Sequence, residues 1–263
     1  VSAWCREAGI VLGQVKTDEK SNEITAVPEL LRKLDIKNAT ITTDALNCQT
    51  EIAKLIVERG GDYLLAVKDN QPSLCHDIET AFKYADTCKA LLENGQSPPL
   101  NSPLIERHHD VDKGHGRLEE RTVEVCRDLD WLVDHIPKWS SLAYFVRVTR
   151  MQTKILTGKI SVEVSYYIGS HSDIKPEAVA KSIRGHWSIE TSLHWVLDMA
   201  FREDDARHRA GNTAENMAIL RHFALNLIKR DKTRTLGVAN TRKLAGWDHR
   251  VLIKILIDSE EEI

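Results

Sequence analysis

Residues 39–68 read ATITTDALNCQTEIAKLIVERGGDYLLAVK, and this stretch indicates the fold class of the chain. Ala39–Thr43 is a short segment rich in β-branched residues that ends at Asp44, and Asp62–Lys68 has the apolar run of a buried strand. Between them, Gln49–Arg59 has apolar residues at helical spacing and is followed by a Gly-Gly stop signal. The order strand, helix, strand predicts an α/β layer structure.

The residues that precede this stretch predict a β-hairpin and a helix. Val1–Trp4 and Ile10–Lys16 are apolar segments on either side of the turn-like Arg6–Gly9. From Ile24 to Leu34, apolar residues recur every three or four positions, which is typical of an amphipathic helix. The first 68 residues are therefore expected to run β-β-α-β-α-β. The chain starts without Met and inside a predicted strand, so we expect it to be a fragment.

The middle of the chain predicts a strand-rich insertion and the remainder predicts helices. Pro72–Leu92 has a helical pattern, and the Gly-rich Asp112–Arg121 resembles a flexible loop that enters a strand. Three β-type segments and then two clear helical segments complete the order: Arg121–Val125, Leu142–Thr149, Ser161–Ile168, Ala178–Ala200 and Ala214–Lys229. We predict an α/β core in two parts, residues 1–74 and 174–230, with a β-rich insertion at 75–173 and a C-terminal helical segment at 231–263.

Composition excludes several classes of protein. No apolar run approaches the roughly 18 residues of a membrane span, and residues 1–10 lack the apolar region of a signal peptide. The five cysteines are scattered and form no CxxC pair, so neither a disulfide framework nor a cysteine zinc site is indicated. A cytoplasmic protein is expected. The formal charge of −3 argues against a protein that simply coats DNA, although a local basic surface can still bind it.

Asp44 is the first candidate for chemistry. It follows a predicted strand, and catalytic groups in open α/β sheets gather at the carboxyl ends of strands. An aspartate at this position can equally well cap the following helix. Both interpretations stay open from the residue pattern alone.

The second candidate is a stripe of acidic and imidazole side chains. His186, Glu190, His194 and Asp198 are spaced four apart, so an α-helix would stack them along one face. A solvated helix face would normally carry Lys and Arg, and this stripe has none. We therefore favour a functional stripe over a solvated one.

Two kinds of metal site are compatible with this stripe. Its imidazoles could hold zinc, which prefers nitrogen ligands. Alternatively, Glu190 could join Asp44 in binding Mg²⁺ or Mn²⁺, which prefer oxygen ligands. The stripe is not an HExxH motif, so zinc-dependent hydrolysis is the weaker alternative.

Several polar residues could contact DNA phosphates or bases. Lys68, Asn70 and Gln71 follow a predicted strand and could also form an ordinary turn. The charged residues from Arg202 to Arg209 could also form a surface ion-pair network. The candidates are Lys68, Asn70, Gln71, Arg184, His186, Trp187, His194, Arg207 and Arg209.

Six segments of the chain resemble the DDE transposases of the H-repeat-associated type, which are insertion-sequence enzymes with a ribonuclease-H-like core. The similarity spans nearly the whole chain, so it is specific. The segments are Lys20–Ile24, Thr42–Gln49, Val67–Gln71, Gly114–Arg121, Arg184–Asp198 and Asn216–Asn226.

The resemblance assigns roles to two residues. It implies that Asp44 is the second catalytic aspartate and that Glu190 is the catalytic glutamate, which follows a β-rich insertion. The family's first aspartate would lie on a strand before the opening hairpin, and Asp18 is too late in the chain to replace it. Related transposases often carry Tyr, Arg, Glu and Lys on the Glu helix, whereas this chain has Ile183, His186, Glu190 and Leu197 there.

The implied reaction is two-metal cleavage of double-stranded DNA at transposon ends, followed by strand transfer, by a homodimer on DNA that uses Mg²⁺ or Mn²⁺. Three alternatives stay open. The first is an inactive DNA-binding remnant of a transposase, and the second is a nuclease that cuts without transposing. The third is a purely structural or zinc-binding role, which predicts stoichiometric zinc at His186 and His194.

Overall fold

The computed structural model describes residues 1–16, 23–99, 101–114, 116–207, 210–231 and 235–257. The predicted role of Arg209 and the position of Asp18 lie outside the described residues. The chain forms two compact units, one made of Val1–Leu34 with Trp187–Ile263 and the other of Asp35–His186. The predicted division at residues 74, 173 and 230 remains a prediction.

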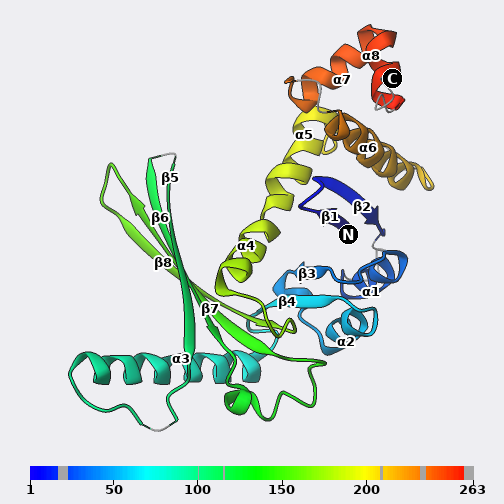
Figure 1. The fold of residues 1–263 in the computed structure, drawn as a ribbon. Coiled ribbons are helices and arrows are strands. Elements are labelled where there is room, and N and C mark those ends of the chain that lie inside the picture. The colour runs from blue at the N-terminus through cyan, green and yellow to red at the C-terminus, as the bar shows by residue number, and fades with distance from the viewer. Residues whose placement is uncertain (17–22, 100, 115, 208–209, 232–234, 258–263) are drawn as a thin grey trace, which may run out of the picture. The chain divides into compact units, whose positions relative to one another are not determined.

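A six-stranded sheet organises the unit Asp35–His186. Its strand order is β3-β4-β8-β7-β6-β5, and β3 and β4 are parallel whereas the other neighbours are antiparallel. The long strands of the predicted insertion thus join the core strand β4 in one sheet (Figure 1). The strands are β3 (Thr40–Thr43), β4 (Asp62–Val67), β5 (Ile105–Gly114), β6 (Arg117–Cys126), β7 (Tyr144–Lys154) and β8 (Ile160–Gly169). The predicted α/β class is confirmed.

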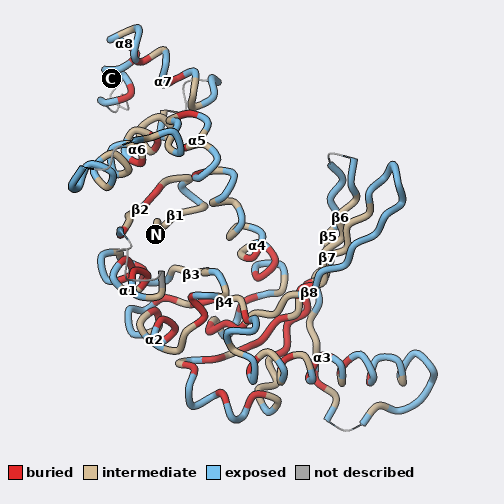
Figure 2. Tube along the Cα trace, turned by 180° about the vertical axis from the view of Figure 1, so that it is seen from behind, coloured by how far each residue is buried: buried red, intermediate tan, exposed pale blue. Residues whose placement is uncertain are grey.

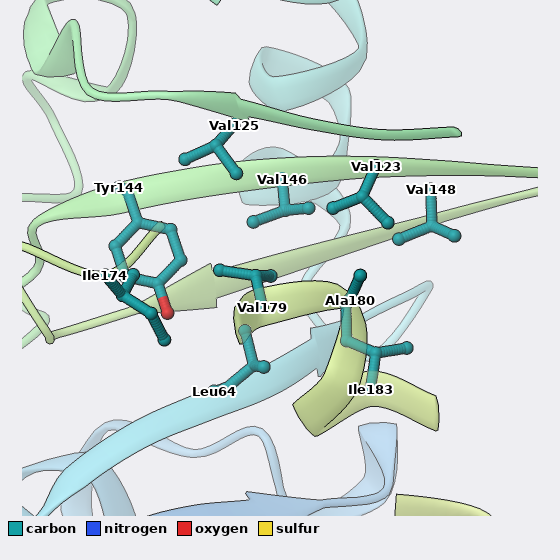
Figure 3. Close-up of a cluster of buried hydrophobic side chains, with 10 residues drawn as sticks. All are labelled: Leu64, Val123, Val125, Tyr144, Val146, Val148, Ile174, Val179, Ala180 and Ile183. Carbon is teal, nitrogen blue, oxygen red and sulfur yellow. The ribbon is translucent and has the colours of Figure 1, made fainter. Parts of the chain in front are cut away.

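Helices cover both faces of this sheet. The face that carries Val146 packs against α4 (Pro176–His186) through Val179, in a buried cluster that also contains Tyr144 (Figure 3). Successive strand residues point to opposite faces, so Phe145 lies on the other face, where it meets α3 (Pro72–Glu93). Burial is accordingly concentrated where these helices cover the sheet, and the far ends of β5 to β8 are mostly exposed or half-buried (Figure 2). The remaining elements are η1 (Ala45–Asn47), α2 (Thr50–Glu58) and η2 (Leu129–Leu132).

The sequence prediction missed β5. Asp112–Arg121, predicted to be a flexible loop, forms the end of a β5–β6 hairpin in which Gly114 pairs with Arg117. Gly116 lies in the turn with φ +72°, a backbone conformation that glycine adopts without steric cost. The strand is hard to recognise because most of its residues are charged or histidine.

The other unit combines a β-hairpin with helices. β1 (Ser2–Cys5) and β2 (Ile10–Gln14) are antiparallel, and β2 lies against α6 (Thr213–Arg230) (Figure 1). α1 (Glu23–Lys33) packs on the same hairpin, where its Leu30 contributes to a small buried cluster. α5 (Trp195–Phe201), α7 (Val238–Trp247) and α8 (His249–Leu256) complete the unit. The predicted hairpin and its following helix are confirmed.

The predicted continuous helix at Ala178–Ala200 is wrong in its middle. The α-helical pattern of α4 ends at His186, and Glu190–His194 form a π-helical turn before α5 begins. A π-turn adds one residue per turn, so the four-residue spacing of the predicted stripe does not stack its members as an α-helix would.

Within the described residues, no helix is long and apolar enough to cross a membrane. The five cysteines are free thiols.

Candidate active site

Asp44 lies at the carboxyl end of β3, beside the parallel strand β4. Its backbone occupies the cap position of η1, but among the described residues its side chain forms no cap hydrogen bond. The N-cap of α2 is Gln49. The interpretation of Asp44 as a helix cap is therefore wrong. Its carboxylate is 64% exposed, which leaves it accessible to a ligand.

His186 links two residues near the end of β3. Its Nε2 lies 3.0 Å from Oδ1 of Asp44, and its Nδ1 lies 3.1 Å from Oγ1 of Thr42. Thr42 and Asp44 are two positions apart, the spacing at which strand residues share a face. A carboxylate oxygen accepts hydrogen bonds, so we assign Nε2–H of His186 as the donor and Oδ1 of Asp44 as the acceptor. The sequence pattern singled out both His186 and Asp44. It did not predict their contact or the hydrogen bond between Thr42 and His186.

Two amide side chains hold the segment that follows Asp44. Nδ2 of Asn70 donates to the carbonyl of Ala45, and Nε2 of Gln71 donates to the carbonyl of Cys48 at 3.0 Å. The segment after β4 is thereby fastened to the segment after β3. Burial raises the pKa of the Cys48 thiol to about 12, so this thiol is protonated and is no nucleophile near neutral pH.

Arg184, in the last turn of α4, is engaged by acidic residues of β5. Its guanidinium pairs with the carboxylate of Asp112 and lies 3.7 Å from that of Asp110. The predicted DNA contact of Arg184 would have to compete with these two carboxylates. Lys68, in contrast, is an exposed residue just beyond the end of β4.

Glu190 is the first residue of the π-helical turn, in the unit that contains Val1–Leu34. Its side chain is exposed, and its backbone carbonyl accepts a hydrogen bond from the amide of Trp195. Leu193 and Leu197 face the buried cluster of this unit and fix which side of the turn is internal. π-Turns are rare and frequently mark functional sites, which is an independent reason to single out Glu190.

Four further candidates for DNA contact are exposed at the surface. Trp187 is 57% exposed and Trp195 is 60% exposed, and both His194 and Arg207 are exposed as well. Throughout the described ranges, no group of three or more His, Cys, Asp or Glu side chains is arranged to hold a metal ion.

Comparison with known proteins finds a matching family and several similar proteins. The family described as "Transposase DDE domain" matches residues 1–227. The chain is 40% identical over 261 residues to "H repeat-associated putative transposase YhhI" and to "Putative protein YbfL", both of Escherichia coli K12, covering 98% of this chain and 65% of each relative. "Putative transposase YncI" of Escherichia coli O157:H7 is 38% identical over 262 residues, which are 99% of this chain and 64% of the relative. The chain thus spans just under two thirds of the length of these relatives. No solved structure matches it at a significant level.

Proposed function

Because this chain belongs to the transposase DDE domain family, we propose that it forms catalytic machinery of a DNA transposase that cuts and joins DNA at insertion-sequence ends. The observation that carries the proposal is the pairing of Asp44 with His186 at the carboxyl end of β3. In such a sheet this edge collects catalytic groups. A ribonuclease-H-like core is part of the proposal, supported by the parallel strands β3 and β4 with α2 between them.

Asp44 and Glu190 are the proposed metal ligands. Both present exposed carboxylates, and oxygen donors fit Mg²⁺ and Mn²⁺. His186 engages Oδ1 of Asp44, and among the described residues no hydrogen bond reaches Oδ2. When bound, the metal ions would activate the attacking water or DNA 3′-hydroxyl and stabilise the leaving oxygen. The resemblance implies a third ligand, an aspartate on a strand upstream of β1, and we include that residue in the proposal.

The protein's own residues would orient the reactants. His186 would restrict the rotation of the Asp44 carboxylate, and Asn70 and Gln71 would hold the backbone that follows it. For DNA binding we propose phosphate contacts from exposed basic residues and stacking from exposed tryptophans. The residues are Lys68, Arg184, Trp187, His194 and Arg207. The substrate would be double-stranded DNA in the cytoplasm, bound by a homodimer that brings two transposon ends together.

The test is Mn²⁺-dependent nicking and strand transfer with DNA that carries the element's own ends. The protein should extend upstream through the expected first aspartate. Asp44→Asn and Glu190→Gln should each abolish nicking and leave end-specific DNA binding intact. Glu177→Gln serves as a matched control, because Glu177 is an exposed carboxylate on α4.

Each other outcome has a distinct meaning. End-specific binding without nicking by the extended protein would identify an inactive remnant. Nicking without strand transfer would identify a nuclease. Nicking that survives Glu190→Gln would refute the assignment of Glu190.

A further inference from the structure

We propose that Lys229 is a positioning residue that holds the π-helical turn on which Glu190 lies; this inference rests on the proposed catalytic role of Glu190. Lys229 comes from the last turn of α6. Its Nζ donates a hydrogen bond of 2.8 Å to the carbonyl oxygen of Ser192. Ser192 is the third residue of the π-turn that starts at Glu190. The ammonium therefore contacts the backbone of the turn itself.

An aromatic ring fixes the same ammonium from β1. Nζ of Lys229 lies 4.3 Å from the centroid of the Trp4 ring, a distance at which the cation is attracted to the π-face. A lysine side chain has four flexible methylene groups, so two simultaneous contacts restrict its end more than one contact would. The Trp4 ring and the Ser192 carbonyl together define one position for Nζ.

The helix that carries Lys229 is itself anchored to the hairpin. Asn226, three residues earlier, accepts a 2.8 Å hydrogen bond from the amide of Val11 and donates a 2.7 Å bond to the carbonyl of the same residue. This amide side chain pairs with β2 as a neighbouring strand would. The position of Lys229 is thus fixed relative to β1 and β2. Its hydrogen bond to Ser192 then holds the π-turn in place relative to the same hairpin.

The π-turn needs such support because it departs from the ordinary helical ladder. Its hydrogen bond joins Glu190 to Trp195, five residues apart, and isolated π-helical turns are rare. Relaxation to an α-helical turn would rotate Glu190 relative to Leu193 and Leu197, whose side chains are buried. The carboxylate would then point in another direction. A donor on the Ser192 carbonyl favours the π-turn over this alternative.

The variants separate the ammonium from the bulk of the side chain. Lys229→Met removes the charge and keeps an unbranched side chain, whereas Lys229→Arg keeps a cation that can reach both partners. Lys243→Met is the matched control, since Lys243 is an exposed lysine on α7 of the same unit. The first readout is hydrogen exchange of the amides between Glu190 and Trp195 in this chain. The second is the kcat of nicking by the upstream-extended protein.

We expect Lys229→Met to accelerate exchange in the π-turn while the amides of β2 and α6 stay protected. We also expect kcat to fall about 10²-fold, the scale of a misplaced catalytic group, with little change in DNA affinity. Lys229→Arg should restore most of the exchange protection and most of the kcat. Lys243→Met should match the unmodified protein in both measurements.

Unchanged exchange in the π-turn of Lys229→Met would overturn the proposal. So would a general loss of protection across α6 and the hairpin together with a parallel loss of DNA binding, because that would show a purely structural role. If Glu190→Gln leaves nicking intact, the catalytic assignment fails while the exchange experiment still decides whether Lys229 holds the turn. The two failures are therefore distinguishable.

Discussion

Nε2 of His186 lies 3.0 Å from Oδ1 of Asp44, although the two residues are 142 positions apart in the sequence. The contact joins the end of α4 to the end of β3 within one compact unit. Thr42 completes the arrangement through Nδ1, so both ring nitrogens have a partner. Hydrogen bonds of this kind orient a carboxylate that binds a metal, and their removal commonly weakens metal affinity.

His186→Ala should therefore impair metal-dependent cleavage more than DNA binding. By the usual effect of removing such a partner, we expect the Mn²⁺ concentration needed for half-maximal nicking to rise by about 10- to 100-fold. A Mn²⁺ titration of nicking, with DNA affinity measured separately, checks this. His76→Ala is the control, because His76 is exposed on α3. An unchanged Mn²⁺ midpoint with reduced DNA affinity would instead support the direct DNA contact predicted for His186.

Asn70→Ala and Gln71→Ala should loosen the segment that follows Asp44. Each variant removes a side-chain hydrogen bond to a backbone carbonyl of residues 45–48, and such a bond contributes about 1 kcal/mol. Nicking should slow with no change in the preferred end sequence, as a competition between matched and mutated ends would reveal. Gln96→Ala, in an exposed loop, should have no effect. A changed sequence preference would show that these amides read bases.

Arg147→Met should strongly destabilise the unit Asp35–His186. Arg147 binds both carboxylate oxygens of Asp86, at 2.6 and 2.7 Å, and also Glu124 at 2.6 Å. Glu124 is 4% exposed, so loss of Arg147 would leave a buried carboxylate without one of the two arginines that pair with it. We expect a loss of about 3–5 kcal/mol in the free energy of unfolding, measured with denaturant.

Arg107→Met is the comparison for this prediction. Arg107 also binds Glu124, at 2.7 Å, but its side chain is 39% exposed and its removal leaves Arg147 in place. Its loss should therefore cost much less. Equal losses in the two variants would contradict the importance assigned to Arg147.

Local patterns predicted the elements whose residues alternate or recur clearly. β4 has a continuous apolar run, and α3 keeps helical spacing from its initial proline to Glu93. β5 was missed because charged and histidine side chains dominate it, and their partners come from other strands and from Arg184. Local propensity has no access to such partners.

The candidate site was predicted residue by residue but not as an arrangement. Position and resemblance single out Asp44 and Glu190, whose catalytic roles remain a prediction. The π-turn could not be predicted, because an added residue in one turn leaves the composition and the apolar spacing nearly unchanged. Lys229 was not singled out, since its partners Ser192 and Trp4 are distant in sequence and one of them is a backbone carbonyl. Thr42 could have been found from its two-residue spacing to Asp44.

The unit that contains His222 should lose stability as the pH falls below neutrality. His222 is 9% exposed, and its Nδ1 has no hydrogen-bond partner among the described residues. Burial, together with nearby His194, lowers the pKa of His222 in the folded protein. In the unfolded chain the group titrates near its ordinary pKa of about 6.5. Below that pH the unfolded chain takes up the proton first, so stability decreases as the pH falls toward the lower folded pKa, by at most about 1.4 kcal/mol per pH unit.

Denaturant unfolding between pH 7.5 and 5 measures this dependence. His222→Gln should flatten this pH dependence, because the variant removes the proton uptake of the imidazole. At a pH above the unfolded pKa of His222, the titration of this group should not change the stability of the unmodified protein. His249→Gln is the matched control, since His249 is exposed on α8 of the same unit. If His222→Gln retains the full loss of stability on acidification, other groups carry that loss, and the burial of neutral His222 does not govern it.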